Sequence, residues 1–201
     1  MIAAKRLLIV GPPGAGKGTQ SAVISEVLGI PAIATGDIFR WNIANGTELG
    51  LQVKSILDAG DFVPDELTCE VVADRLLQED ARDGFLLDGF PRTVGQVEFL
   101  DGFLADHGLA LDGVIQLEAD IDEVVKRLRQ RAIEQGRSDD TEEAIHHRQI
   151  VFAQQTEPIL AIFRERGILL PVNGLGTVEE VTSRIMTALE NLSDNEIAEQ
   201  L

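Results

Sequence analysis

Gly11-Pro12-Pro13-Gly14-Ala15-Gly16-Lys17-Gly18-Thr19-Gln20 is the stretch that decides the fold. The apolar run 7–10 before it is typical of a buried strand in a parallel sheet, and the apolar residues of 21–28 after it recur at helical spacing. Strand, glycine-rich turn and helix together indicate a phosphate-binding loop. Glycines let backbone N–H groups approach phosphate oxygens closely, and the helix N-terminus adds its positive dipole end. The alternative is a glycine- and proline-rich turn before a core helix, and we favour the phosphate-binding loop.

Two residues of this loop determine how it would handle phosphate and metal. Lys17 is expected to reach the β- and γ-phosphates as a mobile point charge. Gly18 follows at the position where most P-loop proteins carry a hydroxyl that binds Mg²⁺ directly. We therefore expect Mg²⁺ to depend more on water, phosphate oxygens and a carboxylate elsewhere in the chain.

The composition fits one globular domain with an unusually acidic surface. The 201 residues are 44% hydrophobic, and 34 acidic against 17 basic side chains give a formal net charge of −17. This charge disfavours a general nucleic-acid binder or a protein of anionic membranes, because both need a broad basic face. Anionic ligands would have to be attracted by arginines gathered locally.

The cysteine count and the first residues of the chain indicate the cellular compartment of the protein. A single cysteine, Cys69, excludes an internal disulfide and a cysteine-cluster metal site, and we expect it to be a small core residue. Residues 1–6 lead straight into the first strand without room for a signal peptide, and no apolar run approaches the length of a membrane span. A cytoplasmic protein is the simplest expectation.

Strands and helices alternate along the chain, which predicts an α/β fold with a doubly wound, mostly parallel sheet of five strands and helices on both faces. The expected strands are 7–10, 30–34, 84–88, 113–117 and 168–172. The expected helices are 21–28, 38–44, 49–57, 66–77, 94–105, 120–133, 141–166 with a bend at Pro158, and 177–192. The acidic tail 193–201 is expected to be loosely held. Ligands of such sheets gather at the carboxyl ends of the strands, where the P-loop and several polar motifs lie.

Those motifs occur in the order found in adenylate kinases, and the chain resembles that family over almost its whole length. The matching segments are the P-loop, Thr35-Gly36-Asp37-Ile38-Phe39-Arg40, Val63-Pro64-Asp65-Glu66, Asp88-Gly89-Phe90-Pro91-Arg92-Thr93, Gly136-Arg137-Ser138-Asp139-Asp140, Arg148 and Gln155-Thr156-Glu157-Pro158. The resemblance implies reversible transfer of the γ-phosphoryl group of Mg·ATP to AMP, giving two ADP. Phosphoryl transfer needs two charged phosphates brought in line and their charge neutralised, which suits this set of cations.

The resemblance also implies a role for each matching residue. Lys17 would grip the donor phosphates, Arg40 and Arg92 the acceptor phosphate, and Asp88 would hold Mg²⁺ through water. Arg131, Arg137 and Arg148 would close over the transferring group, and Arg127 would pack against the donor adenine. The full ATP-binding set is Gly14, Ala15, Gly16, Lys17, Gly18, Thr19, Arg127, Arg131 and Gly176. The full AMP-binding set is Thr35, Gly36, Arg40, Asp61, Phe62, Val63, Gly89, Phe90, Pro91, Arg92, Gln96, Arg137 and Arg148.

The expected organisation is a single P-loop kinase domain, residues 1–201, that works as a monomer. Its core is 1–33, 64–129 and 139–201, its small helical lobe for nucleoside monophosphate (the NMP-binding lobe) is 34–63, and its short lid is 130–138. The lid lacks the long insertion and the four cysteines that hold zinc in some bacterial relatives, so no zinc is expected. We expect His146 and His147 to be surface residues rather than metal ligands, because adjacent histidines on a helix do not share a face and would make a poor chelate.

Two alternatives stay open at this point. A UMP/CMP or broad-specificity nucleoside monophosphate kinase would use the same machinery, although Thr35 favours AMP, because relatives specific for UMP and CMP tend to carry a smaller residue there. A P-loop nucleotide switch or ATPase belongs to a different class. Arg40 and Arg92 lie on separate motifs and argue against it, since a switch has no second phosphate to hold.

Overall fold

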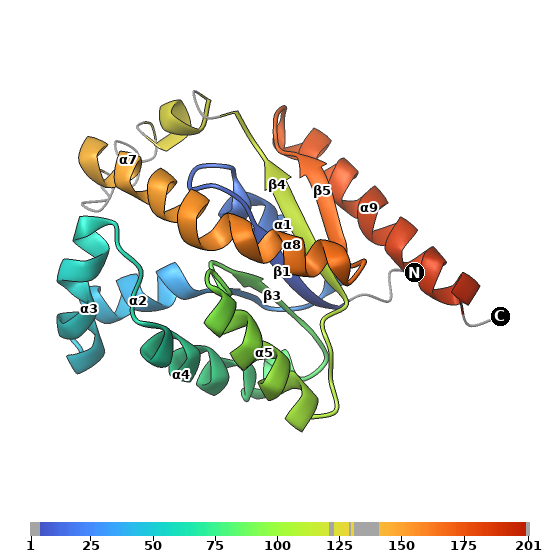
Figure 1. The fold of residues 1–201 in the computed structure, drawn as a ribbon, viewed down its shortest axis with the longest axis horizontal. Helices are drawn as coiled ribbons and strands as arrows, with labels where there is room; N and C mark the ends of the chain where they lie inside the picture. The colour runs from blue at the N-terminus through green and yellow to red at the C-terminus, as the bar shows by residue number, and fades with distance from the viewer. Residues whose placement is uncertain (1–4, 121–122, 129, 131–140, 200–201) are drawn as a thin grey trace.

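The fold is built on one parallel sheet of five strands, as the sequence predicted. In the computed structural model, which describes residues 5–120, 123–128, 130 and 141–199, the strands are β1 (Arg6–Val10), β2 (Ala32–Ala34), β3 (Phe85–Asp88), β4 (Gly113–Glu118) and β5 (Leu169–Asn173). Their order across the sheet is β2-β3-β1-β4-β5, and all neighbours run parallel (Figure 1). The chain moves outward from β1 in both directions, which is the doubly wound arrangement.

The central strands are buried on both faces because they carry apolar runs, with residues 7–10 of β1 and 85–87 of β3 all buried. Successive side chains point to opposite faces of a sheet, and here each face has its own hydrophobic core. On one face Leu8, Leu87 and Val114 pack with α4 (Asp65–Leu76), α5 (Val94–Asp106) and α8 (Glu157–Glu165). On the other, Leu7, Leu86 and Ile115 pack with α1 (Lys17–Leu28) and α9 (Val178–Glu199). Cys69 belongs to the first core, as expected.

The NMP-binding lobe has a small core of its own. It contains α2 (Thr35–Ala44) and α3 (Glu48–Ala59), which lie to the side of the sheet in Figure 1. Phe39, Val53 and Val63 are each at most 5% exposed and form the centre of a separate hydrophobic cluster. Thr47 caps α3 by accepting a hydrogen bond from the Gly50 N–H. The lobe therefore joins the sheet through β2 but packs largely on itself.

The remaining helical segments connect these parts. A short 3₁₀ turn, η1 (Glu79–Ala81), precedes β3, and residues 123–128 are helical within the expected segment 120–133. Next, α7 (Glu142–Val151) leads through a π-helical segment, η2 (Phe152–Thr156), into α8. Pro158 lies in the first turn of α8. A bend was expected at Pro158, and the structure has one turn of π-helix just before it. Proline donates no backbone hydrogen bond and is best tolerated at the start of a helix, which is where Pro158 lies.

Three element boundaries differ from the sequence prediction. The helix after the P-loop begins at Lys17 rather than at residue 21, because Gly16 adopts a left-handed conformation and serves as N-cap. Thr35, Gly36 and Asp37 form the first turn of α2 and not a loop. The last helix was expected to end at Leu192, but α9 continues to Glu199.

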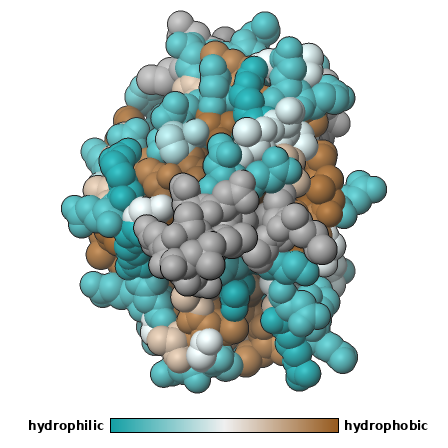
Figure 2. Space-filling model, turned by 90° about the vertical axis from the view of Figure 1, so that its right-hand side faces the viewer, coloured by the Kyte–Doolittle hydropathy of each residue, from teal (hydrophilic) through white to brown (hydrophobic). Residues whose placement is uncertain are grey.

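The surface agrees with the acidic composition. Figure 2 shows the side of the molecule that carries both termini, where hydrophilic residues predominate and hydrophobic residues appear in small separate areas. Within the ranges described, none of the helices is long and apolar enough to span a membrane.

Candidate active site

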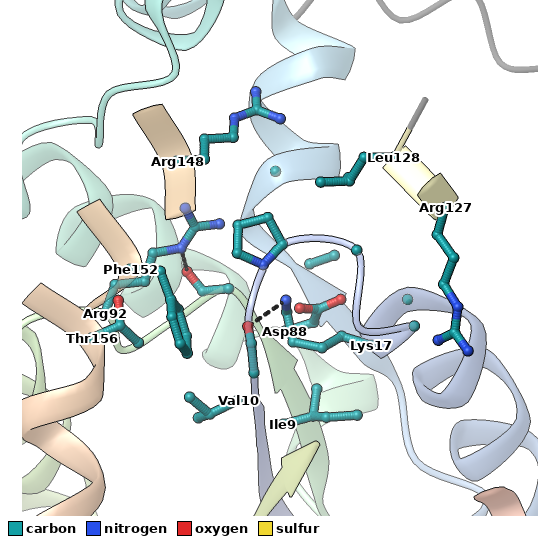
Figure 3. Close-up of a pocket in the computed structure, with 18 of the residues that line it drawn as sticks. Ile9, Val10, Lys17, Asp88, Arg92, Arg127, Leu128, Arg148, Phe152 and Thr156 are labelled. Atoms are coloured by element: carbon teal, nitrogen blue, oxygen red, sulfur yellow. Dashed lines mark hydrogen bonds between the residues drawn. The ribbon is translucent and has the colours of Figure 1, made fainter. Parts of the chain in front are cut away.

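A large cavity opens at the carboxyl ends of the strands, where a doubly wound sheet is expected to bind ligands. Its volume is about 910 Å³, and residues from the P-loop, the NMP-binding lobe, the β3–α5 loop and α7 line it (Figure 3). Asp88 and Lys17 lie side by side near its centre. Arg92, Phe152 and Thr156 lie on one side of them, and Arg127 lies on the other. The cavity thus has two halves that meet at the end of β3. We call the half on the Arg92 side the acceptor half and the half on the Arg127 side the donor half, after the nucleotides that the sequence leads us to expect there.

The P-loop has the backbone conformation that phosphate binding requires. Gly14 and Gly16 have φ values of 90° and 97°, which other residues rarely adopt. A Cβ on Gly14 would also lie 2.8 Å from the Val124 carbonyl oxygen, so the loop fits closely against helical residues 123–128. The turn leads directly into the N-terminus of α1, whose free N–H groups and dipole favour an anion.

Lys17 is held by the loop itself. Its Nζ donates hydrogen bonds to the carbonyl oxygens of Gly11 (2.8 Å) and Pro12 (3.1 Å). Burial raises the pKa of Asp88, and the charge of Lys17 partly offsets this rise. Lys17 also lines the cavity, so it is available to an anion on the loop.

Asp88 and Arg92 are opposite charges at the base of the acceptor half. Burial raises the pKa of Asp88 above its usual range, although Lys17 and Arg92 act in the opposite direction. Burial lowers the pKa of Arg92 to about 10, and Asp88 partly offsets this shift. Arg92 stays charged at neutral pH, so it supplies a positive charge in a poorly hydrated place where charges interact strongly.

The Arg92 guanidinium is fixed on two sides. Its Nε donates to the Gly89 carbonyl oxygen at 2.7 Å, and its Cζ lies 4.8 Å from the centre of the Phe62 ring. The Gly89 carbonyl accepts a second hydrogen bond from the Thr35 hydroxyl at 3.0 Å. Arg40, on α2, pairs with Asp37 at 2.5 Å and also lines the cavity. Two arginines from different elements therefore face the acceptor half.

Gln96 lies deeper than the cavity wall. It is 2% exposed, and its Oε1 accepts from the Arg92 N–H at 2.8 Å. Its Nε2 donates to Asp65 Oδ1 at 2.6 Å, and the other Asp65 oxygen accepts from the Thr93 hydroxyl. Gln96 thus supports the Arg92 backbone, while its expected contact with the acceptor base stays a prediction.

Arg127 forms the edge of the donor half. Its Nε donates to Glu123 at 3.2 Å, and its Nη1 donates to the Gly174 carbonyl oxygen at 3.3 Å. Gly174 follows β5, and its N–H donates to the Glu118 carbonyl at the end of β4. The guanidinium is therefore held beside the P-loop by the ends of two strands.

Most of the residues expected at the site line this cavity. They are Gly14, Gly16, Lys17, Gly18, Thr19, Gly36, Arg40, Asp61, Phe62, Asp88, Gly89, Pro91, Arg92, Arg127 and Arg148. Others lie behind its wall or beside it, namely Ala15, Thr35, Val63, Phe90, Gln96 and Gly176. Arg131 and Arg137, with nearly all of the expected lid, lie outside the described residues.

The sequence did not indicate some residues in and beside the cavity. Gln149 on α7, beside the cavity, donates from Nε2 to the Pro13 carbonyl oxygen at 3.1 Å, and no motif singles it out. Phe152 and Thr156 line the acceptor half from η2. Thr156 belongs to the motif 155–158, for which the sequence analysis gave no individual roles. The π-helical conformation of η2 is a further signal, because π-helical turns are frequent at functional sites.

Only one of the two histidines of α7 is as exposed as the sequence predicted. His146 is exposed, but His147 is half-buried and its Nε2 lies 2.6 Å from Asp61 Oδ1. Among the residues that the structure describes, no three His, Cys, Asp or Glu side chains are grouped to hold a metal ion. The donor set at the cavity is instead one of carboxylate oxygens, of which Asp88 is the closest to the P-loop.

Comparison with known proteins agrees with this geometry. The family model for adenylate kinase matches residues 9–168. The adenylate kinase of Leifsonia xyli subsp. xyli is 61% identical over 183 residues, which are 91% of this chain and 92% of the relative. That of Clavibacter michiganensis is 60% identical over 184 residues (92% of each chain), and that of Kocuria rhizophila is 58% identical over 185 residues (92% and 98%). The chain belongs to the adenylate kinase family.

Proposed function

We propose that this cavity catalyses the reversible transfer of the γ-phosphoryl group of Mg·ATP to AMP, giving two ADP, as an ATP:AMP phosphotransferase. The observation that carries the proposal is the meeting of two cationic sets at one carboxylate. Lys17 acts on Asp88 from the P-loop, and Arg92 and Arg40 act on it from the acceptor half, so that all three charges partly offset the rise in its pKa that burial causes. A second set of cations facing the P-loop suits a second phosphate.

The protein acts mainly by positioning and charge, because phosphoryl transfer needs little covalent help. Lys17 moves from the Gly11 and Pro12 carbonyls to the donor phosphates. Arg127 packs against the donor base, and Arg40 and Arg92 hold the acceptor phosphate in line. Arg148 reaches the transferring group from α7, and Arg131 and Arg137 join it as the lid closes. Closure over the cavity excludes water and so limits wasteful hydrolysis of ATP.

Asp88 is suited to hold magnesium. Its carboxylate opens onto the cavity beside the P-loop, and a Cβ added to Gly18 would lie 3.8 Å from its Oδ2. Mg²⁺ prefers oxygen ligands and keeps several waters, so one carboxylate with water and phosphate oxygens is a sufficient donor set. When bound, the ion would supply positive charge that offsets the charge developing on the transferring phosphate. Gly18 has no hydroxyl to offer, so Asp88 is the side chain that would hold the ion through water.

The division into a core, an NMP-binding lobe and a short lid is part of the proposal. The separate cluster around Phe39 and Val53 supports a lobe over 34–63 that moves as a unit. Both substrate halves are built from one chain, which supports a monomer, and the cytoplasm is where ATP, AMP and ADP are exchanged. Light scattering after gel filtration tests the monomer, and a stable dimer would contradict it.

A coupled assay with Mg·ATP and each nucleoside monophosphate in turn tests the activity. Fast ADP formation is expected with AMP and much slower formation with UMP, CMP and GMP. Arg92→Ala is expected to reduce the rate by orders of magnitude, while Arg164→Ala, an exposed arginine on α8, serves as the matched control. Comparable rates with UMP or CMP would favour the broad-specificity alternative. ATP hydrolysis that ignores both the acceptor and Arg92 would leave a P-loop ATPase.

A further inference from the structure

We propose that His147 is a positioning residue for the acceptor half. It acts through Asp61, which it holds against α7, so that AMP affinity depends on the charge of His147. The inference rests on the proposed function, because it concerns the binding of AMP in this cavity. It starts from a contact between two segments that are 86 residues apart in the chain.

The segment 60–64 that follows α3, here called the acceptor loop, lies directly on α7. Gly60 has a φ of 82°, and a Cβ at this position would lie 3.1 Å from the Ala144 carbonyl oxygen and 3.3 Å from Arg148 Cγ. A larger residue would therefore push the acceptor loop away from the helix. The close approach places Asp61 within reach of the next turn of α7.

The contact itself is short and open to water. His147 Nε2 lies 2.6 Å from Asp61 Oδ1, and the two side chains are 41% and 54% exposed. A neutral imidazole with its proton on Nε2 donates to the carboxylate, and an imidazolium does the same with a full positive charge. The hydrogen bond thus persists in both states, while protonation adds an ionic attraction. Because both groups are exposed, the proton exchanges freely with solvent.

The pair lies one residue from two groups of the cavity wall. Asp61 precedes Phe62, whose ring packs on the Arg92 guanidinium, and His147 precedes Arg148, which lines the cavity from α7. Holding Asp61 to His147 therefore fixes Phe62 and Arg148 relative to each other across the mouth of the acceptor half. A tighter pair keeps the site in the arrangement that receives AMP and so removes part of the ordering cost of binding.

Few other charges lie on the two elements near this pair. On α7 the neighbouring titratable or charged groups are Glu143, one turn earlier, His146 and Arg148. On α3 they are Lys54 and Asp58, which pair with each other. His147 directly contacts the acceptor loop through Asp61. A positive charge at this position should accordingly strengthen the hold on this loop.

The test is AMP affinity by calorimetry at one fixed pH, at low and at high salt and without ATP, for wild type, His147→Gln and His147→Lys, each with Asp61 and with Asp61→Asn. At low salt His147→Lys, always charged, should bind AMP about two- to five-fold more tightly than His147→Gln, the scale of an exposed ion pair. The difference should shrink at high salt, because salt screens exposed charges. With Asp61→Asn in place, His147→Lys and His147→Gln should bind AMP equally well.

Two controls separate the possible outcomes. His146→Gln should behave as wild type, and ATP affinity should not follow the His147 charge in any variant. If AMP binds the wild type but His147→Gln and His147→Lys have the same AMP affinity at low salt, the positioning role is overturned while the proposed function stands. If AMP does not bind the wild type, the proposed function itself fails. Equal thermal stability of His147→Gln and His147→Lys shows that both variants are folded.

Discussion

Gln149 on α7 and Pro13 in the P-loop are joined by a hydrogen bond, in which the Gln149 amide donates to the Pro13 carbonyl oxygen at 3.1 Å. The bond ties the P-loop to the helix that carries Arg148. It spans 136 residues of sequence, and the loop also fits closely against helical residues 123–128.

Gln149→Ala is therefore expected to loosen the P-loop. A net loss of about 0.5–1.5 kcal/mol for one hydrogen bond corresponds to roughly a two- to ten-fold higher KM for ATP. The KM for AMP should change less, because the acceptor half does not depend on this contact. Gln154→Ala, an exposed glutamine on η2, is the matched control. Equal increases for both nucleotides would show that α7 itself has moved.

Asp88→Asn is expected to increase stability while it destroys activity. Burial raises the pKa of Asp88, so ionisation costs more in the folded protein than in the unfolded chain. The penalty is absent below the unfolded pKa of about 4, grows as the pH rises from there to the raised folded pKa, and is complete above it. Thermal unfolding should show a higher Tm for the variant at pH 7 and a smaller difference at pH 4.

The same substitution removes the carboxylate expected to hold magnesium. Turnover with Mg·ATP should fall by about 100-fold or more, the scale of removing one electrostatic group from such a site. Asp83→Asn, which changes an exposed carboxylate before β3, should leave both Tm and turnover near the wild-type values. A variant that is active but no more stable would contradict both roles assigned to Asp88.

Thr156→Val should stabilise the fold. Thr156 is 3% exposed, and in the described part of the chain its hydroxyl has no hydrogen-bond partner. Removing an unpaired buried hydroxyl while keeping the shape should add about 1 kcal/mol, or roughly 2–4 °C in Tm. Thr182→Val is the contrasting change, because its hydroxyl donates towards Gln20 and Val178, and it should lower the Tm.

Cys69 should be unreactive in the native protein. Burial, with a smaller effect of Asp65, raises the pKa of its thiol to about 11, so at pH 8 only about a thousandth is thiolate. Modification by a thiol reagent should be slow at pH 8, become faster above pH 10, and be complete within minutes after unfolding in urea. Rapid labelling of the folded protein at pH 8 would place Cys69 at the surface.

The sequence was sufficient for the sheet because each strand carries an apolar run followed by glycine or polar residues. The motifs were also sufficient to bring Lys17, Asp88 and Arg92 to one edge, since the carboxyl ends of parallel strands meet there. The position of Thr35 could not be predicted in the same way. The register that pairs Ala34 with Asp88 places the Thr35 hydroxyl against the Gly89 carbonyl, and register is a property of the folded sheet.

Contacts between side chains that are far apart in the sequence could not be predicted either. Neither Gln149 nor His147 belongs to a motif that explains its contact, and a glutamine or histidine on a helix is usually just solvated. Pro158 predicted a bend in the helix but not the π-helical turn that precedes α8. A proline shows where a backbone hydrogen bond is missing, but it does not show how the turn before it rearranges.

The NMP-binding lobe carries its own hydrophobic centre around Phe39, Val53 and Val63, apart from the two cores of the sheet. A segment with its own small hydrophobic core unfolds locally at a lower free-energy cost than the whole domain does. On warming, this lobe should lose its order before the sheet unfolds. The upper temperature limit of catalysis would then be set by the melting of this unit of roughly thirty residues. Substitutions such as Val53→Ala would lower that limit without changing the temperature at which the rest of the domain unfolds.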